Sequence, residues 1–266
     1  QNTRLMSRIM KSAYDLDCLI MQHAEDFELS KNGMMNDGII STKLGLQGIP
    51  DIAEKIIIER DLTLLEDLNC RYHVSQISSS KSVDIIEQKK EMVSFTTGVS
   101  INNLSLNEND IGDFRTFLKL SPPLRTEDDR ISLIKGINKN LIDVIVSDHK
   151  PEDEESKRLT FSQAATGASG VETLLPLSLE LFHNGSVKLF KLIELLTSNP
   201  AKILKIDKGN LSIGNDADFC IVDIYKPWIV KKEKIVSKSK NTCIDDKKLQ
   251  GQVVNTFVKG EELFKI

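Results

Sequence analysis

The sequence predicts an α/β fold, in which helices cover a parallel sheet, followed by a small β-rich segment. Between residues 3 and 148, stretches with helical spacing of apolar residues alternate four times with short apolar runs. Those runs are apolar at successive positions, as strands are when both faces of a parallel sheet are covered. After Ile206 the sequence pattern changes from helical spacing to short β-rich runs, which are separated by glycine and asparagine. We therefore expect an α/β part, residues 1–206, and a β part, residues 207–266.

The first two helix–strand pairs occupy residues 3–78. Apolar residues recur at helical spacing from Thr3 to Asp17, and the run "CLIMQH" then predicts a buried strand. A second amphipathic segment runs from Ile49 to Leu68, with Pro50 suited to a first helical turn. The β-rich "RYHVSQIS", Arg71 to Ser78, follows it and predicts the second strand.

The next two pairs repeat this pattern. Ser80 to Glu91 predicts a helix with Ser80 as its cap, and the β-branched run "MVSFTTGVS" from Met92 predicts a strand. Thr126 to Lys139 begins with acidic residues, as helices often do, and leads into "IDVIVSD". The helical stretches 170–183 and 187–206 complete the α/β part.

Four strands in this span suggest half of a larger fold. A complete eight-stranded (β/α)8 barrel of the TIM type needs about 250 residues. We therefore expect a partial TIM-like barrel, about strands 5 to 8, followed by the small β segment. The chain begins without methionine, inside an expected helix. Together these features lead us to expect the C-terminal part of a longer protein.

Composition limits the function classes. The net charge of -4 is mild and the lysines are spread along the chain, so nucleic-acid binding is not expected. No apolar stretch reaches the length of a membrane span. The cysteines are far apart and form no C-x-x-C pair, which favours reduced thiols and a cytoplasmic protein: Cys18, Cys70, Cys220 and Cys243. Small molecules or other proteins are the expected partners.

Three residues at or near expected strand ends suggest a metal site. His23 follows "CLIMQ", His73 lies within "RYHVSQIS", and Asp148 follows "IDVIVS". Sites in parallel α/β folds form at the carboxyl ends of strands. Imidazoles and a carboxylate suit zinc, and such a carboxylate can also move a proton. A lone histidine is more often structural, and we interpret His183, at a helix end, in that way.

The segment "SPPLRTEDDR" leaves two interpretations open. Arg125 is either a surface residue beside a rigid turn or a group whose guanidinium or backbone shapes the site.

Several motifs, in order, resemble the dihydroorotases of the amidohydrolase superfamily, in the class related to allantoinases and hydantoinases. The likeness runs from about Asp15 to the C-terminus. It is carried by "MQHAED", "YHVSQIS", "KLSPPLR", "IDVIVSDHKPEDEESKR", "GASGVETLLPLSLEL", "LTSNPAKIL" and "GNLSIGNDADFCIVD".

The resemblance implies a metal-dependent barrel with a small β-sandwich that interconverts L-dihydroorotate and N-carbamoyl-L-aspartate in pyrimidine biosynthesis. It implies one or two zinc ions, with His23, His73 and Asp148 as ligands and Asp148 also as the general acid/base. It further implies a homo-oligomer. The family's remaining metal ligands would lie before Gln1, so this chain alone is expected to be inactive.

Departures from the family pattern fall among the expected substrate contacts, Ser121, Arg125, Glu152, Thr166 and Gly167. Serine, glutamate and threonine stand where the family commonly has asparagine, histidine and phenylalanine. An acid at position 152 disfavours an anionic substrate. A related hydantoinase or allantoinase and a noncatalytic partner of aspartate carbamoyltransferase are therefore the alternatives. Because the visible ligands are retained, an enzyme is favoured.

Overall fold

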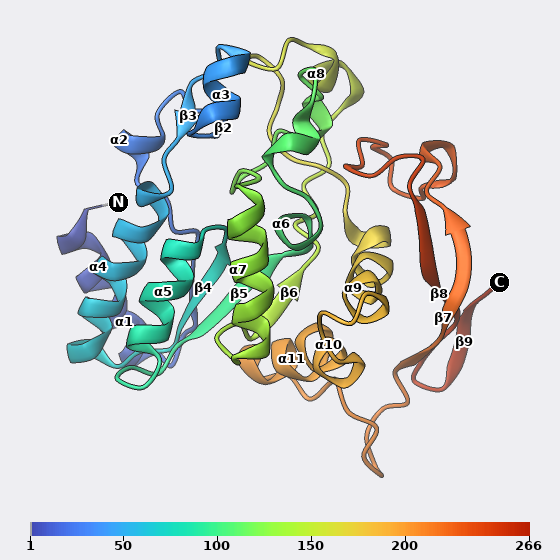
Figure 1. Ribbon diagram of the computed structural model, residues 1–266. Coiled ribbons are helices and arrows are strands. Elements are labelled where there is room, and N and C mark those ends of the chain that lie inside the picture. Colours follow the sequence, from blue (N-terminus) through green and yellow to red (C-terminus); the bar gives the residue numbers. More distant parts are fainter. Residues whose placement is uncertain (1) are drawn as a thin grey trace.

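The computed structural model describes residues 2–266, and a four-stranded parallel sheet forms the centre of this part of the chain (Figure 1). The strands are ordered β1, β4, β5, β6, so each main strand pairs with the next one along the chain. Their bounds are Ile20–Gln22, Tyr72–Ile77, Thr96–Ser100 and Val144–Val146. The expected α/β class with a parallel sheet is thereby confirmed.

Helices pack on this sheet and against one another in chain order. α1, α4, α5 and α7 span Thr3–Asp15, Ile52–Leu68, Ser80–Lys89 and Glu127–Asn138, and each contacts the next. Ile58 and Leu62 of α4 are fully buried, which explains the apolar periodicity of that segment. In α1 the buried residues are Met6, Met10 and Ala13, whereas Leu5, Ile9 and Leu16 of the expected apolar repeat are exposed. These helices hold the strand ends in fixed positions.

An insertion between β1 and α4 was not expected from the sequence. It contains α2 (Phe27–Ser30), β2 (Met35–Asn36), α3 (Ile39–Leu44) and β3 (Gly48–Ile49), with β2 and β3 paired in parallel. These elements are too short for apolar periodicity to reveal them. In Figure 1 the insertion lies above the sheet, beyond the carboxyl ends of its strands.

The segments before α7 and after β6 complete the rim above the sheet. α6 spans Ile101–Ser105, and α8 spans Glu154–Arg158. Short 3-10 turns lie at Glu108–Ile111, Thr116–Leu118, Val171–Thr173 and Lys232–Lys234.

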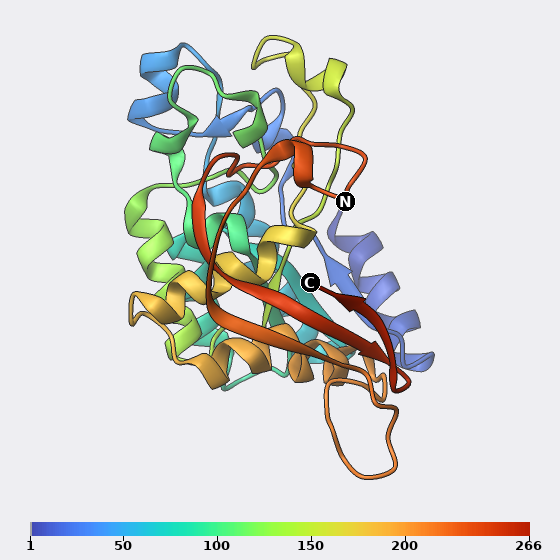
Figure 2. The ribbon, with the colours of Figure 1, turned by 90° about the vertical axis from the view of Figure 1, so that its right-hand side faces the viewer.

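The last part of the chain packs on α9. α9 (Leu174–His183), α10 (Leu189–Leu196) and α11 (Ser198–Leu204) are followed by the antiparallel strands β7 (Phe219–Ile229), β8 (Lys248–Val258) and β9 (Glu261–Lys265). β8 contacts α9, and the sheet lies across this helix in Figure 2. In the described residues this part is a single three-stranded sheet, whereas a sandwich requires two.

Three element bounds differ from the expected ones for local reasons. The cap of α5 is Ser79, whose side chain accepts from Ser82 N. β5 begins at Thr96 and not at Met92, because the amides of Met92 and Val93 still bond to Lys89 at the end of the preceding helix. The expected helix 187–206 is divided at residue 197, just before Pro200, which has no N–H to donate.

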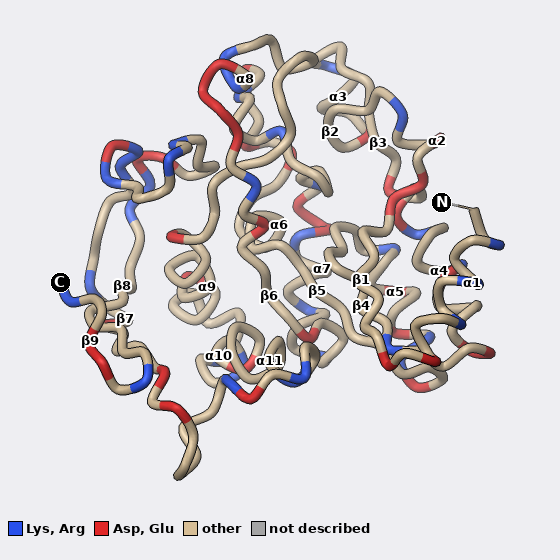
Figure 3. Tube along the Cα trace, turned by 180° about the vertical axis from the view of Figure 1, so that it is seen from behind, with Lys and Arg blue, Asp and Glu red and all other residues tan. Residues whose placement is uncertain are grey.

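Charged residues of both signs are distributed along the whole chain trace (Figure 3). Lys and Arg appear on elements from α1 to β9, in keeping with their even spacing in the sequence. In residues 2–266, no helix combines the length and the apolar character that crossing a bilayer requires.

Candidate active site

Four polar residues meet beyond the carboxyl ends of the parallel strands. His23 directly follows β1, Gln76 is the penultimate residue of β4, and Asp148 lies two residues after β6. Gln76 Nε2 donates a hydrogen bond of 2.9 Å to Asp148 Oδ1. Ser121 Oγ lies 3.3 Å from His23 Nε2. We call these four residues, His23, Gln76, Ser121 and Asp148, the edge cluster.

Asp148 has the properties of a proton-transfer residue. Its φ of 49° lies in the left-handed region, which is uncommon for residues other than glycine and is often found at functional sites. Burial raises the pKa of its carboxyl group, and the hydrogen bond from Gln76 opposes this shift. Ser100 Oγ lies 3.5 Å from Oδ2. A carboxyl group with a raised pKa holds a proton more readily than an ordinary aspartate, as a group that accepts and returns protons must.

His23 lies at the open side of the edge cluster and is 40% exposed. Its Nε2 is 3.7 Å from Glu25 Oε2. The contact with Glu25 raises the pKa of His23, burial opposes this, and the charge of Asp148 adds a smaller increase. His23 and Asp148 thus belong to one electrostatic environment, and their predicted role as metal ligands stays a prediction.

The expectation that His73 lies at the strand end is wrong. β4 begins at Tyr72, so His73 is its second residue and four more residues follow it in the strand. At about 3.3 Å per residue, Gln76 lies about 10 Å further along the strand. His73 Nδ1 bonds to Thr96 Oγ1 at 2.8 Å. The charges that influence its pKa are those of Asp143 and Lys90, whereas Asp148 has no such influence.

His73 should make stability depend on pH. Burial lowers its pKa to about 4. Because an imidazole in the unfolded chain titrates near pH 6.5, the unfolded state binds more protons between these values, and stability falls as pH decreases through this window, by up to about 3 kcal/mol. Urea unfolding of the full-length protein at pH 7 and at pH 4.5 measures this loss. His73→Gln should reduce it, and an equal loss in the variant would exclude His73 as its source.

The donor set predicted for zinc is not assembled in this structure. In residues 2–266, no three histidine, cysteine, aspartate or glutamate side chains are grouped closely enough to hold a metal ion. The edge cluster brings His23 and Asp148 together, and zinc sites use three or four protein ligands. His23 and Asp148 are therefore residue types that bind zinc, but two side chains are fewer than a zinc site needs.

Arg125 shapes the site from within and is not a surface residue. It is 3% exposed. Its Nη1 donates to Asn36 Oδ1 at 2.9 Å and to the carbonyl of Ile49 at 2.5 Å, and its Nε donates to Ser78 Oγ at 3.1 Å. These bonds hold Nε and Nη1 within the protein, and the expected substrate contact stays a prediction. Arg125 joins the insertion to the end of β4.

Gly167 and Thr166 lie in a loop that is held by two buried lysines. Lys157 Nζ donates to the carbonyls of Ala165 and Gly167 at 2.7 and 2.9 Å. Lys119 Nζ donates to the carbonyls of Ser162 and Ala164. Burial lowers the pKa of Lys157 to about 8. The two lysines fix the backbone next to Thr166, which is half-buried.

Gly167→Ala should destabilise the protein. Its φ is +136°, and an added Cβ would lie 2.6 Å from Lys150 O. We expect a loss of about 2–4 kcal/mol from backbone strain and overpacking. Gly185→Ala is the control, because φ is +76° there but the space is open; about 1 kcal/mol is expected. Chemical unfolding of both variants measures the difference, and equal losses would show that Lys150 moves aside without cost.

Glu152 lies on the rim, away from the edge cluster. It lines a cavity of about 670 Å³ together with Lys238 and Lys240. The carbonyl of Glu152 accepts from Ser239 Oγ at 2.5 Å. Acidic and basic side chains are mixed in this cavity, which is also lined by Asp153, Glu154, Lys232 and Glu233. The like-charge repulsion expected from the sequence stays a prediction.

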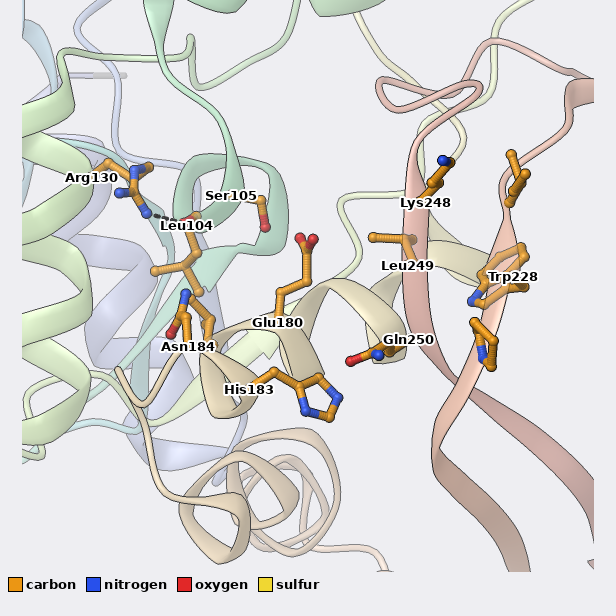
Figure 4. Close-up of a pocket in the computed structure, with 13 residues that line it drawn as sticks. Leu104, Ser105, Arg130, Glu180, His183, Asn184, Trp228, Lys248, Leu249 and Gln250 are labelled. Carbon is orange, nitrogen blue, oxygen red and sulfur yellow. Dashed lines mark hydrogen bonds between the residues drawn. The ribbon is translucent and has the colours of Figure 1, made fainter.

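A larger cavity, of about 830 Å³, lies between α9 and the strands β7 and β8 (Figure 4). Glu180 and His183 of α9 and Trp228 of β7 line it. His183 Nε2 lies 3.0 Å from the carbonyl of Ile224, in keeping with the structural role predicted for it. None of the edge-cluster residues lines this cavity. We therefore place the candidate chemistry at the strand ends.

Gln76 and Glu54 contribute to the site but were not identified from the sequence. Glu54 accepts from the backbone amide of Ser78 at 2.9 Å and so fixes the end of β4. A glutamate within a helix and a glutamine within a strand carry no recognisable signal. The one available signal for Gln76 was its place near the end of an apolar run.

A parallel sheet with polar side chains beyond its carboxyl strand ends is the arrangement of α/β enzymes. The chain belongs to the amidohydrolase family, whose model, "Amidohydrolase family", matches residues 1–263.

Two curated relatives are named dihydroorotase. The one from Ehrlichia chaffeensis is 42% identical over 99% of this chain and 60% of its own length. The one from Ehrlichia canis is 41% identical over 99% of this chain and 59% of its own length. The chain thus spans about 60% of the length of these relatives.

Solved structures of hydantoinase type have a similar fold. L-hydantoinase from Arthrobacter aurescens matches with a TM-score of 0.87 and 26% identity, over 100% of this chain and 61% of that one. Dihydropyrimidinase from Brevibacillus agri matches with a TM-score of 0.87 and 19% identity, over 98% of this chain and 59% of that one. The second likeness supports the fold alone.

Proposed function

We propose that this chain carries part of the active site of a dihydroorotase, a hydrolase that opens and closes a cyclic amide. The observation that carries the proposal is Asp148, a carboxyl group with a raised pKa and a left-handed backbone at a strand end. The curated relatives named dihydroorotase support the choice of substrate. In this proposal L-dihydroorotate and N-carbamoyl-L-aspartate are interconverted, as a step of pyrimidine biosynthesis.

Asp148 would move one proton in each direction of the reaction. During ring opening, water adds to the ring carbonyl carbon, and the Asp148 carboxylate takes the proton released from that water. The bond between this carbon and the ring nitrogen then breaks, and Asp148 returns the proton to the nitrogen. Ring closure reverses both transfers. His23 and Ser121 flank the open side of the cluster, where they would bind the substrate; Thr166 and Gly167 would form its wall.

Comparing two ring substrates tests this proposal. We expect the full-length protein to hydrolyse L-dihydroorotate with a higher kcat/KM than hydantoin, measured from the loss of ring absorbance. A preference for hydantoin would favour the hydantoinase-type alternative that the structural neighbours suggest. Absence of turnover for both rings, in a folded protein, would contradict an enzymatic role.

The proposal also covers the fold, the metal and the assembly of the whole protein. We propose that the four-stranded sheet is part of a TIM-like barrel and that the β7–β9 sheet belongs to a small sandwich. Zinc in the whole protein would be bound mainly by ligands outside residues 2–266, with His23 as the neighbouring imidazole. A cytoplasmic location fits the free cysteines Cys18, Cys70, Cys220 and Cys243. The homo-oligomer is proposed from the family resemblance.

A noncatalytic role is the second candidate, and the incomplete donor set at the edge cluster favours it. In that role the protein would stabilise an aspartate carbamoyltransferase assembly. Co-expression of both full-length proteins followed by gentle affinity purification tests this idea. Recovery of carbamoyltransferase together with an inactive dihydroorotase-like protein would support it, and separate elution of the two would count against it.

A further inference from the structure

The two donors of the edge cluster already have protein partners. Asp148 Oδ1 accepts the hydrogen bond from Gln76 Nε2, at 2.9 Å. His23 Nε2 is paired with Ser121 Oγ, at 3.3 Å. These are the two atoms that a cation between the strand ends would bind. Asp148 Oδ1 is instead bonded to a neutral amide, and His23 Nε2 lies near both the Ser121 hydroxyl and, at 3.7 Å, the Glu25 carboxylate.

Gln76 is placed poorly for a cation. Its carboxamide directs an N–H donor toward Asp148, and this positive end of the amide dipole would face any ion bound at the same oxygen. Ser100 Oγ, 3.5 Å from Asp148 Oδ2, adds a second hydroxyl on the other side of the carboxylate. His73, near the start of β4, is bonded to Thr96, the first residue of the neighbouring strand β5.

We infer that Gln76 and Ser100 take the place of a divalent cation around Asp148, so that Asp148 is not a metal ligand in this protein. Gln76 is then a positioning residue, because it holds the carboxylate toward the strand-end opening through a hydrogen bond. The inference shares the site of the proposed function, but it concerns metal binding and does not depend on which ring is hydrolysed.

Metal content tests the inference without measuring activity. The full-length protein and its variants are purified from zinc-supplemented medium, and zinc per chain is measured by mass spectrometry. We expect Asp148→Asn to retain the wild-type zinc content. Gln76→His should add up to one equivalent, or tighten zinc binding by about tenfold or more in competition with a chromogenic chelator, because it completes a set of three donors.

Two further variants test whether the zinc gained by Gln76→His is bound at the edge cluster or elsewhere on the protein. In Gln76→His/Asp148→Asn the added zinc should be lost, since Asp148 would supply one of the three donors. His73→Gln, on the same strand, should leave the wild-type zinc content unchanged. Loss of zinc from Asp148→Asn or from His73→Gln, with thermal unfolding unchanged, would overturn the inference. No gain of zinc by a folded Gln76→His would also overturn it.

Discussion

Replacing Asp148 with asparagine is expected to lower kcat for L-dihydroorotate hydrolysis by about 10²–10⁴-fold, the usual contribution of a positioned acid/base. Asparagine keeps the size of the side chain but cannot accept and return a proton. The amide oxygen can still accept from Gln76 Nε2, and the amide nitrogen can donate to Ser100 Oγ, so the local structure should persist. The loss should therefore appear in kcat, with little change in KM or in thermal stability.

Glu154→Gln is the matched control for this experiment. Glu154 is an exposed acid on the segment that follows Asp148, and it pairs with Arg158 at 2.6 Å. It has no contact with the edge cluster, so kcat should stay within about twofold of wild type. If Asp148→Asn retained more than a tenth of wild-type kcat, another group would have to carry the proton. A rise in KM alone would assign Asp148 to substrate binding.

The helices and main strands could be predicted because they are long or strongly patterned. α4 buries Ile58, Leu62 and Leu65 at helical spacing, so its apolar residues were visible in the sequence. The parallel arrangement of the strands followed from their alternation with helices. The insertion with β2 and β3 is held by Arg125, a contact between residues far apart in the chain. Local pattern carries no information about such a contact.

The candidate site could be predicted only in part. Asp148 and His23 follow the ends of short apolar runs, so their placement was correct. The strand in "RYHVSQIS" was predicted, but its polar residues His73 and Gln76 lie three positions apart, and the sequence does not show which of them is near the strand end. Histidine is the commoner metal ligand, so His73 was predicted; in the structure Gln76 is the penultimate residue of the strand. Element bounds are the least certain result of pattern analysis.

Arg125→Leu is expected to destabilise the protein by about 3–5 kcal/mol, the usual cost of breaking a buried charge network. Its loss leaves Asn36 Oδ1 without its donor, and the carbonyl of Ile49 keeps only the bond from the amide of Asp37. It also removes the positive charge near two buried carboxylates, Glu54 and Glu108, which are 2% and 7% exposed. Both acids bond to partners of Arg125, Ser78 and Asn36 respectively.

Arg158→Leu provides the same substitution at a site that is 64% exposed, where the ion pairs with Glu154 and Glu155 should contribute less than about 1 kcal/mol. Chemical unfolding of both full-length variants gives the comparison. A substrate contact at Arg125 would instead appear as a raised KM in a protein of normal stability, and that outcome would contradict the buried network. Because the guanidinium joins the insertion to the end of β4, we expect the loss of stability to be accompanied by a loosened edge cluster and a lower kcat.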